Sequence, residues 1–221
     1  MAQPSAQQKR NTIIIIASIA VIGGGIWLWK DVLEDRLIPK RWGVVEPGAI
    51  YRSGQIHPSL IEKMLKKNHI EVIIAMTGEI PGDPEQAAEE KAAQKLGIEL
   101  KRFPLGGDGT GDINNYAQAI TTLVEAQKEG KPTLVHCAAG SQRTGGVIAF
   151  YRLLFQNEDP QKVYQEMLEF DWHDTPEAPL VPYINEHMEE LVQLLQEMGT
   201  LTTRPDPLPQ AYSRYSDNPA K

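Results

Sequence analysis

Short apolar runs alternate with longer helical segments along most of this chain, and this alternation limits the folds that it can adopt. The run at residues 70–76 is apolar and rich in β-branched side chains, which suits a strand buried on both faces. Segments between such runs carry apolar residues at helical spacing. Strands that alternate with helices predict an α/β domain with a mostly parallel central sheet flanked by helices.

Capping signals mark the ends of several helices. Asp83 and Asp112 each stand directly before a helical segment as an N-cap, and Pro84 suits a first turn. Gly97 and Gly130 end the same two segments. The expected strands cover residues 49–52, 70–76, 98–105 and 132–136. The expected helices cover residues 59–68, 84–96, 113–129, 144–156, 160–169 and 181–198.

Residues 12–29 carry no charge and end in a segment with two tryptophans. As a helix this run would be about 27 Å long, close to the roughly 30 Å of a bilayer core. It lacks the polar stripe of a core helix, and no small-residue cleavage site of a signal peptide follows it. We therefore expect one transmembrane helix, a lipid bilayer as partner, and a single-pass protein of a membrane such as the bacterial inner membrane.

Basic residues lie on both sides of this run, and the two groups predict opposite orientations in the membrane. Lys9 and Arg10 favour an N-terminus inside. Four basic residues that follow the run favour the reverse: Lys30, Arg36, Lys40 and Arg41. Both orientations stay open, and a topology reporter fused after Lys221 would distinguish them.

The rest of the chain divides by composition. We expect an N-terminal tail at residues 1–11, the membrane helix at 12–29, a juxtamembrane connector at 30–41 and a globular domain at 42–200. Residues 201–221 contain four prolines and few large apolar groups. Such a composition predicts a disordered tail.

Charge and cysteine content exclude several classes of function. The net charge is −7 and the isoelectric point about 5.3, so the chain lacks the basic footprint of a nucleic-acid-binding protein. Cys137 is the single cysteine. One cysteine excludes a disulfide within the chain and a C-x-x-C metal site.

The most informative segment covers residues 135–145, Val-His-Cys-Ala-Ala-Gly-Ser-Gln-Arg-Thr-Gly. It reads as a buried strand, a turn rich in small residues, and the start of a helix. Such a turn points several backbone N–H groups into one concavity that suits a tetrahedral dianion. The residues expected to bind this anion are Ala138, Ala139, Gly140, Ser141, Gln142 and Arg143.

Each reactive side chain of this segment has a chemical role in that arrangement. Backbone amides and the helix dipole favour the thiolate form of Cys137, the candidate nucleophile. Arg143 can fold back across the turn and hold two phosphate oxygens. Thr144 places a hydroxyl beside the sulfur, and His136 is expected to orient the loop through a backbone hydrogen bond. The competing interpretation is a structural cysteine followed by an unrelated arginine.

The string His136-Cys137-x5-Arg143-Thr144 resembles the signature loop of the protein tyrosine and dual-specificity phosphatase superfamily. The segment at residues 51–55, Tyr-Arg-Ser-Gly-Gln, is similar to compact bacterial and fungal members, and the resemblance covers residues 42–199. It implies attack of Cys137 on phosphorus, a phosphocysteine intermediate and its hydrolysis by water. It also implies that no metal or other cofactor takes part.

The resemblance further implies an aspartate that protonates the leaving oxygen and then activates water. Asp108 is the first candidate because it lies among glycines in a segment with no helix to cap. Asp112 is the second, although helix capping already explains it. Asp174 is the third. Arg52 is expected to brace the fold by pairing with a carboxylate and is left out of the site.

Substrate class follows from the loop interior, where residues 138–142 are uncharged. Relatives that act on inositol phosphates or phosphoinositides usually carry basic residues there, so a phosphotyrosine monoester is expected, then phosphoserine or phosphothreonine. The partner is accordingly a phosphoprotein or small phosphomonoester, with an inositol phosphate or phosphoinositide as the alternative substrate.

Two further classes share such a loop. A catalytically silent phosphoprotein-binding module is one, although silent relatives commonly lose the cysteine or the arginine. A sulfurtransferase or arsenate reductase is the other. Sulfurtransferase loops typically have a different spacing, and the disulfide relay of a thiol-based reductase is unavailable to a chain with one cysteine.

Overall fold

The structure of the chain is a computed structural model that describes residue 7, residues 15–16, 18–19 and 21–25, and residues 34–215. It divides into two units, Met1–Ile38 and Pro39–Lys221. The first unit holds the short helix α2 (Glu34–Leu37). Among the described residues, no helix is both long and apolar enough to cross a membrane. The expected membrane helix falls partly outside these residues, so the anchor stays a prediction.

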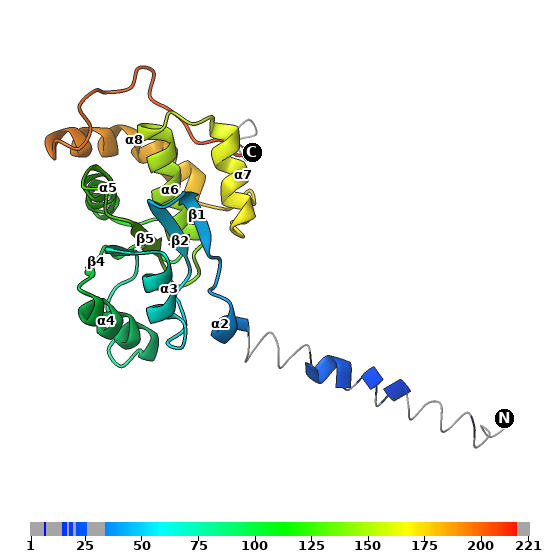
Figure 1. Cartoon of the computed structure of the whole chain (residues 1–221). Coiled ribbons are helices and arrows are strands. Elements are labelled where there is room, and N and C mark those ends of the chain that lie inside the picture. The colour runs from blue at the N-terminus through cyan, green and yellow to red at the C-terminus, as the bar shows by residue number, and fades with distance from the viewer. Residues whose placement is uncertain (1–6, 8–14, 17, 20, 26–33, 216–221) are drawn as a thin grey trace, which may run out of the picture. The chain divides into compact units, whose positions relative to one another are not determined.

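The second unit is built on a five-stranded sheet with strand order β1-β2-β5-β3-β4 (Figure 1). Strand β1 runs antiparallel to β2, whereas the β2–β5, β5–β3 and β3–β4 pairs are parallel. The expected α/β fold with a mostly parallel sheet is therefore confirmed. The strands are β1 (Gly43–Glu46), β2 (Ile50–Ser53), β3 (Val72–Ala75), β4 (Glu99–Arg102) and β5 (Thr133–His136).

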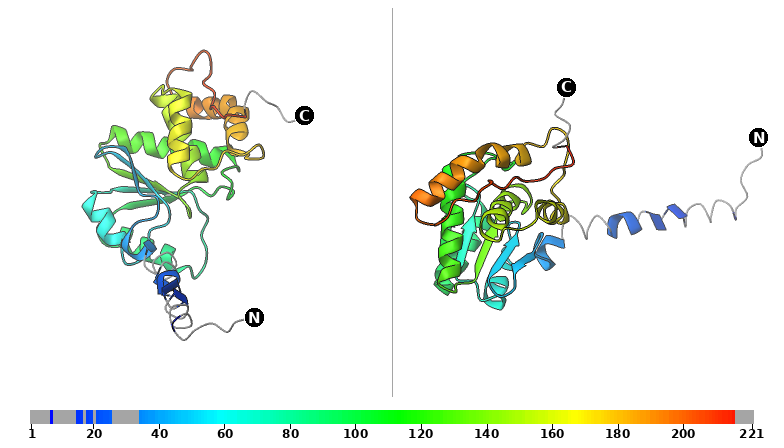
Figure 2. Two further views of the ribbon diagram at one scale, coloured as in Figure 1. Left: turned by 90° about the vertical axis from the view of Figure 1, so that its right-hand side faces the viewer. Right: turned by 90° about the horizontal axis from the view of Figure 1, so that it is seen from above.

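Helices cover both faces of this sheet, as two turned views also show (Figure 2). Ile73 and Leu134 face the smaller apolar cluster with α3 and α4, whereas Ile74 and Val135 face the larger cluster with α5, α6, α7 and α8. Central strands buried on both faces explain their continuous apolar sequence. The helices are α3 (Ile61–Lys67), α4 (Pro84–Leu96), α5 (Ile113–Lys128), α6 (Gln142–Phe155), α7 (Pro160–Glu169) and α8 (Leu180–Glu197).

The predicted caps lie where the helices begin and end. Asp83 accepts hydrogen bonds from the first-turn N–H groups of α4, and Gly97 ends that helix with φ 68°. Asp112 accepts the Asn114 N–H at the start of α5. Helix α6 begins at Gln142, two residues before the expected start, so its first turn belongs to the signature loop.

The prediction of a disordered tail is wrong for residues 201–215. Ala211 is buried, and its backbone N–H and carbonyl both bond to the side chain of Asn185 on α8. Ser213 and Arg214 bond to Asp174. This segment has few apolar groups of its own, and side chains elsewhere in the domain bind the backbone of Ala211 and Arg214. Residues 216–221 lie outside the described residues.

Candidate active site

The backbone of the loop between β5 and α6 forms a cradle, and Cys137 lies at the base of this cradle. The thiol is 1% exposed, and the Gly140 N–H donates to its sulfur at 3.1 Å. Gly140 has φ 81°, and a Cβ there would lie 2.4 Å from the Gly54 nitrogen. Only glycine fits this position, because both its backbone conformation and the close approach of Gly54 exclude a side chain.

Three consecutive carbonyls of the loop are held by donors outside it. The bonds run from the Gln55 N–H to Ala138 (3.1 Å), from Arg41 Nη1 to Ala139 (2.8 Å) and from Arg52 Nη2 to Gly140 (3.2 Å). In a planar trans peptide the carbonyl and the N–H point in opposite directions. The N–H groups that follow these carbonyls therefore point away from the three donors, and the sequence-predicted nest has a structural cause.

The Cys137 thiol is tuned by opposing effects. Burial alone would raise its pKa. The hydroxyl and backbone N–H of Thr144, the Gly140 N–H and the charge of Arg143 lower the pKa by more than burial raises it. The pKa of Cys137 therefore lies below its ordinary value. A thiol in this setting reacts as its thiolate.

Arg143 lies half-buried at the start of α6 and acts electrostatically on Cys137. Within residues 34–215, its Nε is buried and makes no hydrogen bond. The Ser141 hydroxyl oxygen in the same loop is likewise buried without a hydrogen bond in that part of the chain. Together they are polar atoms at the start of α6 with unused capacity for an anion.

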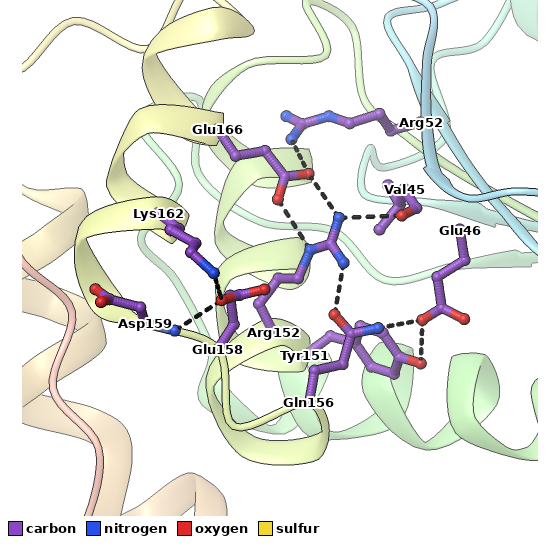
Figure 3. A network of polar contacts seen from close by, with 10 residues as sticks. All are labelled: Val45, Glu46, Arg52, Tyr151, Arg152, Gln156, Glu158, Asp159, Lys162 and Glu166. Atoms are coloured by element: carbon purple, nitrogen blue, oxygen red, sulfur yellow. Dashed lines mark hydrogen bonds and ion pairs between the residues drawn. The ribbon is translucent and has the colours of Figure 1, made fainter.

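Arg52 braces this loop from β2, as its position near a strand end predicted. Its guanidinium is buried, lies over the Phe170 ring at 3.8 Å and stands 3.7 Å from Glu166. Burial lowers the pKa of Arg52 to about 10, although Glu166 and Cys137 oppose that shift. Figure 3 shows Glu166 of α7 between Arg52 and Arg152, so an extended ion-pair network fixes the arginine that holds Gly140.

The ring of His136 pairs with a buried carboxylate, whereas the sequence predicted an orienting hydrogen bond to the backbone. Its Nε2 lies 2.8 Å from Glu89 Oε1, and both side chains are 1% exposed. Burial disfavours the charged ring, but Glu89 raises the pKa of His136 above its ordinary value. Burial likewise opposes the Glu89 carboxylate, yet His136 and Arg102 lower its pKa. Gln55 also bonds to Glu89 at 3.4 Å, linking this pair to the signature loop.

Asp108 lies in a glycine-rich loop that packs against the signature loop. A Cβ on the adjacent Gly109 would stand 3.3 Å from the backbone of Gln142. The buried Tyr116 hydroxyl donates to the Gly109 carbonyl at 2.6 Å, and its raised pKa, caused mainly by burial, also responds to the charges of Cys137 and Asp108. The backbone N–H and hydroxyl of Thr110 lower the pKa of Asp108 itself.

The other two candidate acids have structural partners. Asp112 is exposed and caps α5 through the Asn114 N–H at 2.9 Å. Asp174 is buried, accepts a hydrogen bond from Tyr164 and holds the C-terminal segment through Ser213 and Arg214. Among the described residues there is no group of three or more acidic, histidine or cysteine side chains that would hold a metal.

Sequence reasoning missed two residues beside the loop. Arg41 was assigned to the connector outside the domain, and Glu89 lies on the helical stretch between Asp83 and Gly97 without a motif of its own. Gln55 lies in the motif at residues 51–55, but its bond to the signature loop could not be predicted from spacing. Each of these contacts joins residues far apart in the chain, so no local signal marks them.

Comparisons with known proteins agree with this geometry. A family model described as "Tyrosine phosphatase family" matches residues 57–169, half of the chain. The dual specificity protein phosphatase OPG106 of vaccinia virus (strain Copenhagen) is 35% identical over 68 residues, which cover 30% of this chain and 40% of the viral protein. The chain thus matches less than half the length of the curated relatives.

Two solved structures share the fold. P. aeruginosa TpbA has a TM-score of 0.56 at 20% identity, and the match covers 72% of this chain and 91% of that one. The core catalytic domain of the PP-IP phosphatase SIW14 from S. cerevisiae has a TM-score of 0.57 at 17% identity, and the match covers 80% and 99%. At these identities the likeness concerns the fold alone.

We predict that Glu89→Gln lowers the free energy of unfolding by about 3 kcal/mol, because it leaves the buried His136 without its counter-charge. Glu90→Gln is the matched control, since the adjacent Glu90 also contacts Arg102 but is exposed, and we expect little change. Urea denaturation measures both. Equal losses in the two variants would contradict a special role for the buried pair.

The same pair predicts a pH dependence. A raised pKa of His136 contributes stability that is fully present below its ordinary value of about 6.5 and is lost as pH rises through the folded value. The lowered pKa of Glu89 contributes stability above about pH 4.3 that is lost on acidification. The stability gap between wild type and Glu89→Gln should therefore be widest between these limits and narrow on both sides.

Proposed function

The chain belongs to the tyrosine phosphatase family, and from that premise we propose that it hydrolyses phosphoric monoesters through a phosphocysteine intermediate. One observation carries the proposal: a buried thiol with a lowered pKa accepts the Gly140 N–H near an arginine whose buried Nε makes no hydrogen bond in the described part of the chain. A cysteine with a purely structural role would not require a hydrogen-bond donor and an arginine near its thiol. A silent binding module would not need a thiol with a lowered pKa.

In the first step the Cys137 sulfur attacks phosphorus, a P–S bond forms and the P–O bond to the leaving group breaks. Loop N–H groups and Arg143 hold the non-bridging oxygens and the charge that develops on them. In the second step water attacks phosphorus and the P–S bond breaks. Inorganic phosphate leaves, and the Thr144 hydroxyl stabilises the released thiolate.

Asp108 is the proposed general acid for the leaving oxygen and the base for the water. The contact of its loop with Gln142, and the response of Tyr116 to both Asp108 and Cys137, support this choice. Bonds from Thr110 keep Asp108 ionised in the present arrangement. Donating a proton therefore requires the loop to move and to release the carboxylate from Thr110.

The proposed substrates are phosphotyrosine residues in proteins, followed by phosphoserine and phosphothreonine. Residues 138–142 give the cradle no cation besides Arg143, and the two outer arginines, Arg41 and Arg52, are engaged with loop carbonyls. An inositol phosphate carries several anionic groups that would need further cations. One phosphate on a neutral aromatic ring fits this set of donors better.

We propose also that residues 12–29 anchor the protein in a membrane. The apolar, uncharged sequence of this run supports the proposal, and side chains described within it, such as Ile19 and Val21, are exposed. Retention of the protein in the membrane fraction after alkaline extraction would test it.

We predict that Cys137→Ser lowers kcat for p-nitrophenyl phosphate at least about a thousandfold, because the hydroxyl is a far weaker nucleophile. Arg143→Ala should cost about a hundred- to a thousandfold, since it removes transition-state donors. Arg204→Ala is the matched control, because this exposed arginine pairs with Glu189 away from the loop. Turnover by the serine variant at the wild-type rate would rule out the covalent intermediate.

We predict that Asp108→Asn affects poor leaving groups most. Loss of the acid should lower kcat about a hundredfold with a phosphotyrosine peptide and much less with p-nitrophenyl phosphate, whose leaving group needs little protonation. Asp112→Asn should leave both rates near wild type, since asparagine also caps helices. If the leaving-group dependence instead follows Asp112, the acid role moves to that residue.

We predict that kcat/KM is higher for phosphotyrosine peptides than for phosphoserine peptides or inositol hexakisphosphate. The reason is the single arginine among uncharged loop positions. Release of inorganic phosphate measures all three substrates under one set of conditions. A preference for the inositol phosphate would overturn the substrate class while leaving the phosphocysteine mechanism intact.

A further inference from the structure

The peptide between Ala139 and Gly140 is held at both ends. Its N–H donates to the Cys137 sulfur at 3.1 Å, and its carbonyl accepts from Arg41 Nη1 at 2.8 Å. Because the peptide is planar, the direction of its carbonyl fixes the direction of its N–H. A donor on the carbonyl side therefore controls the bond on the sulfur side.

Arg41 is itself fixed in place. Its Nε pairs with Asp171 at 2.8 Å, and its side chain is 28% exposed. Arg41 and Asp171 have φ values of 45° and 58°, which residues other than glycine adopt rarely and keep only where the surroundings hold them. The carbonyl of the preceding Lys40 accepts the Gly54 N–H at 2.8 Å. The start of the domain is thus attached to the signature loop through Arg41 and to the turn after β2 through Lys40.

We propose that Arg41 is a positioning residue of the active site, which turns the Gly140 N–H onto the Cys137 sulfur by holding the carbonyl of the same peptide. A guanidinium on a carbonyl oxygen makes a charge-assisted hydrogen bond, stronger than one from a neutral donor. Polarisation of the peptide strengthens its N–H as a donor. This bond stabilises the thiolate more than the protonated thiol, because the thiolate is the better acceptor of that N–H.

Other charged and titratable groups also face the sulfur and set the background against which Arg41 acts. They are Arg143 from α6, Arg52 from β2, His136 at the end of β5, and Tyr116 from α5. None of them contacts the Ala139 carbonyl in the described residues, where Arg41 is its hydrogen-bond donor. Replacing Arg41 therefore removes its bonds to this peptide and to Asp171, and it deletes none of these four groups.

Iodoacetamide alkylation tests the proposal on the full chain. Cys137 is the single cysteine, so the pH dependence of labelling reports one thiol. Arg41→Gln should raise the midpoint of that dependence by about half to one pH unit, the effect of weakening one hydrogen bond to the thiolate. Lys40→Gln is the matched control, because it removes the neighbouring charge and keeps the backbone bond to Gly54.

A midpoint raised in Arg41→Gln and unchanged in Lys40→Gln supports the proposal. Unchanged midpoints in both, or equal shifts in both, overturn it. If Arg41→Gln does not fold, Arg41→Lys serves instead. Lysine keeps the charge but lacks the fork that holds Asp171 and Ala139 together, so an intermediate shift is expected and a wild-type midpoint overturns the proposal.

The effect on catalysis rests on the proposed function, and a second readout separates the two. Activity of Arg41→Gln on p-nitrophenyl phosphate should be reduced at low pH and recover as pH rises, whereas a purely structural defect would lower it at every pH. If the wild-type chain hydrolyses no phosphomonoester, the proposed function fails, and the alkylation series still decides the role of Arg41.

Discussion

Burial opposes the ionisation of a thiol, so a fold that leaves Cys137 1% exposed must supply donors to offset that cost. Here the Gly140 N–H donates to the sulfur, and Thr144 and the charge of Arg143 also lower the pKa of the thiol. A backbone N–H can face the sulfur only while the carbonyl of the same peptide points away and is hydrogen-bonded elsewhere. The strand β2, the turn after it and the first residues of the domain provide those bonds, and this requirement explains why Gly54 and Gly140 pack so closely.

Behind the loop, each of two carboxylates lies between two basic side chains. Glu166 forms ion pairs with Arg52 and Arg152. Glu89 forms ion pairs with His136 and Arg102. Removing one partner from such a set leaves a charge without compensation, which costs more than the pair contributes. These sets connect α7, α4 and β4 to the residues on either side of Cys137. The position of the thiol therefore depends on packing across the whole sheet.

Most of the fold could be predicted because its signals are local, as in the β-branched run at residues 70–76 that forms β3. Cys137 and Arg143 could be predicted for the same reason, since they lie in one continuous segment. Arg41 and Glu89 could not, because their partners lie far along the chain and their neighbours look like ordinary exposed charges. Strand β1 and the packed C-terminal segment were missed because other elements, not their own composition, hold them in place.

The solitary cysteine has a consequence for redox chemistry. A thiol that ionises readily is also the one most readily oxidised to a sulfenic acid. With no second thiol in the chain, Cys137 cannot be protected by an internal disulfide. Any disulfide that it forms must join it to another molecule, and its burial restricts that partner to small thiols.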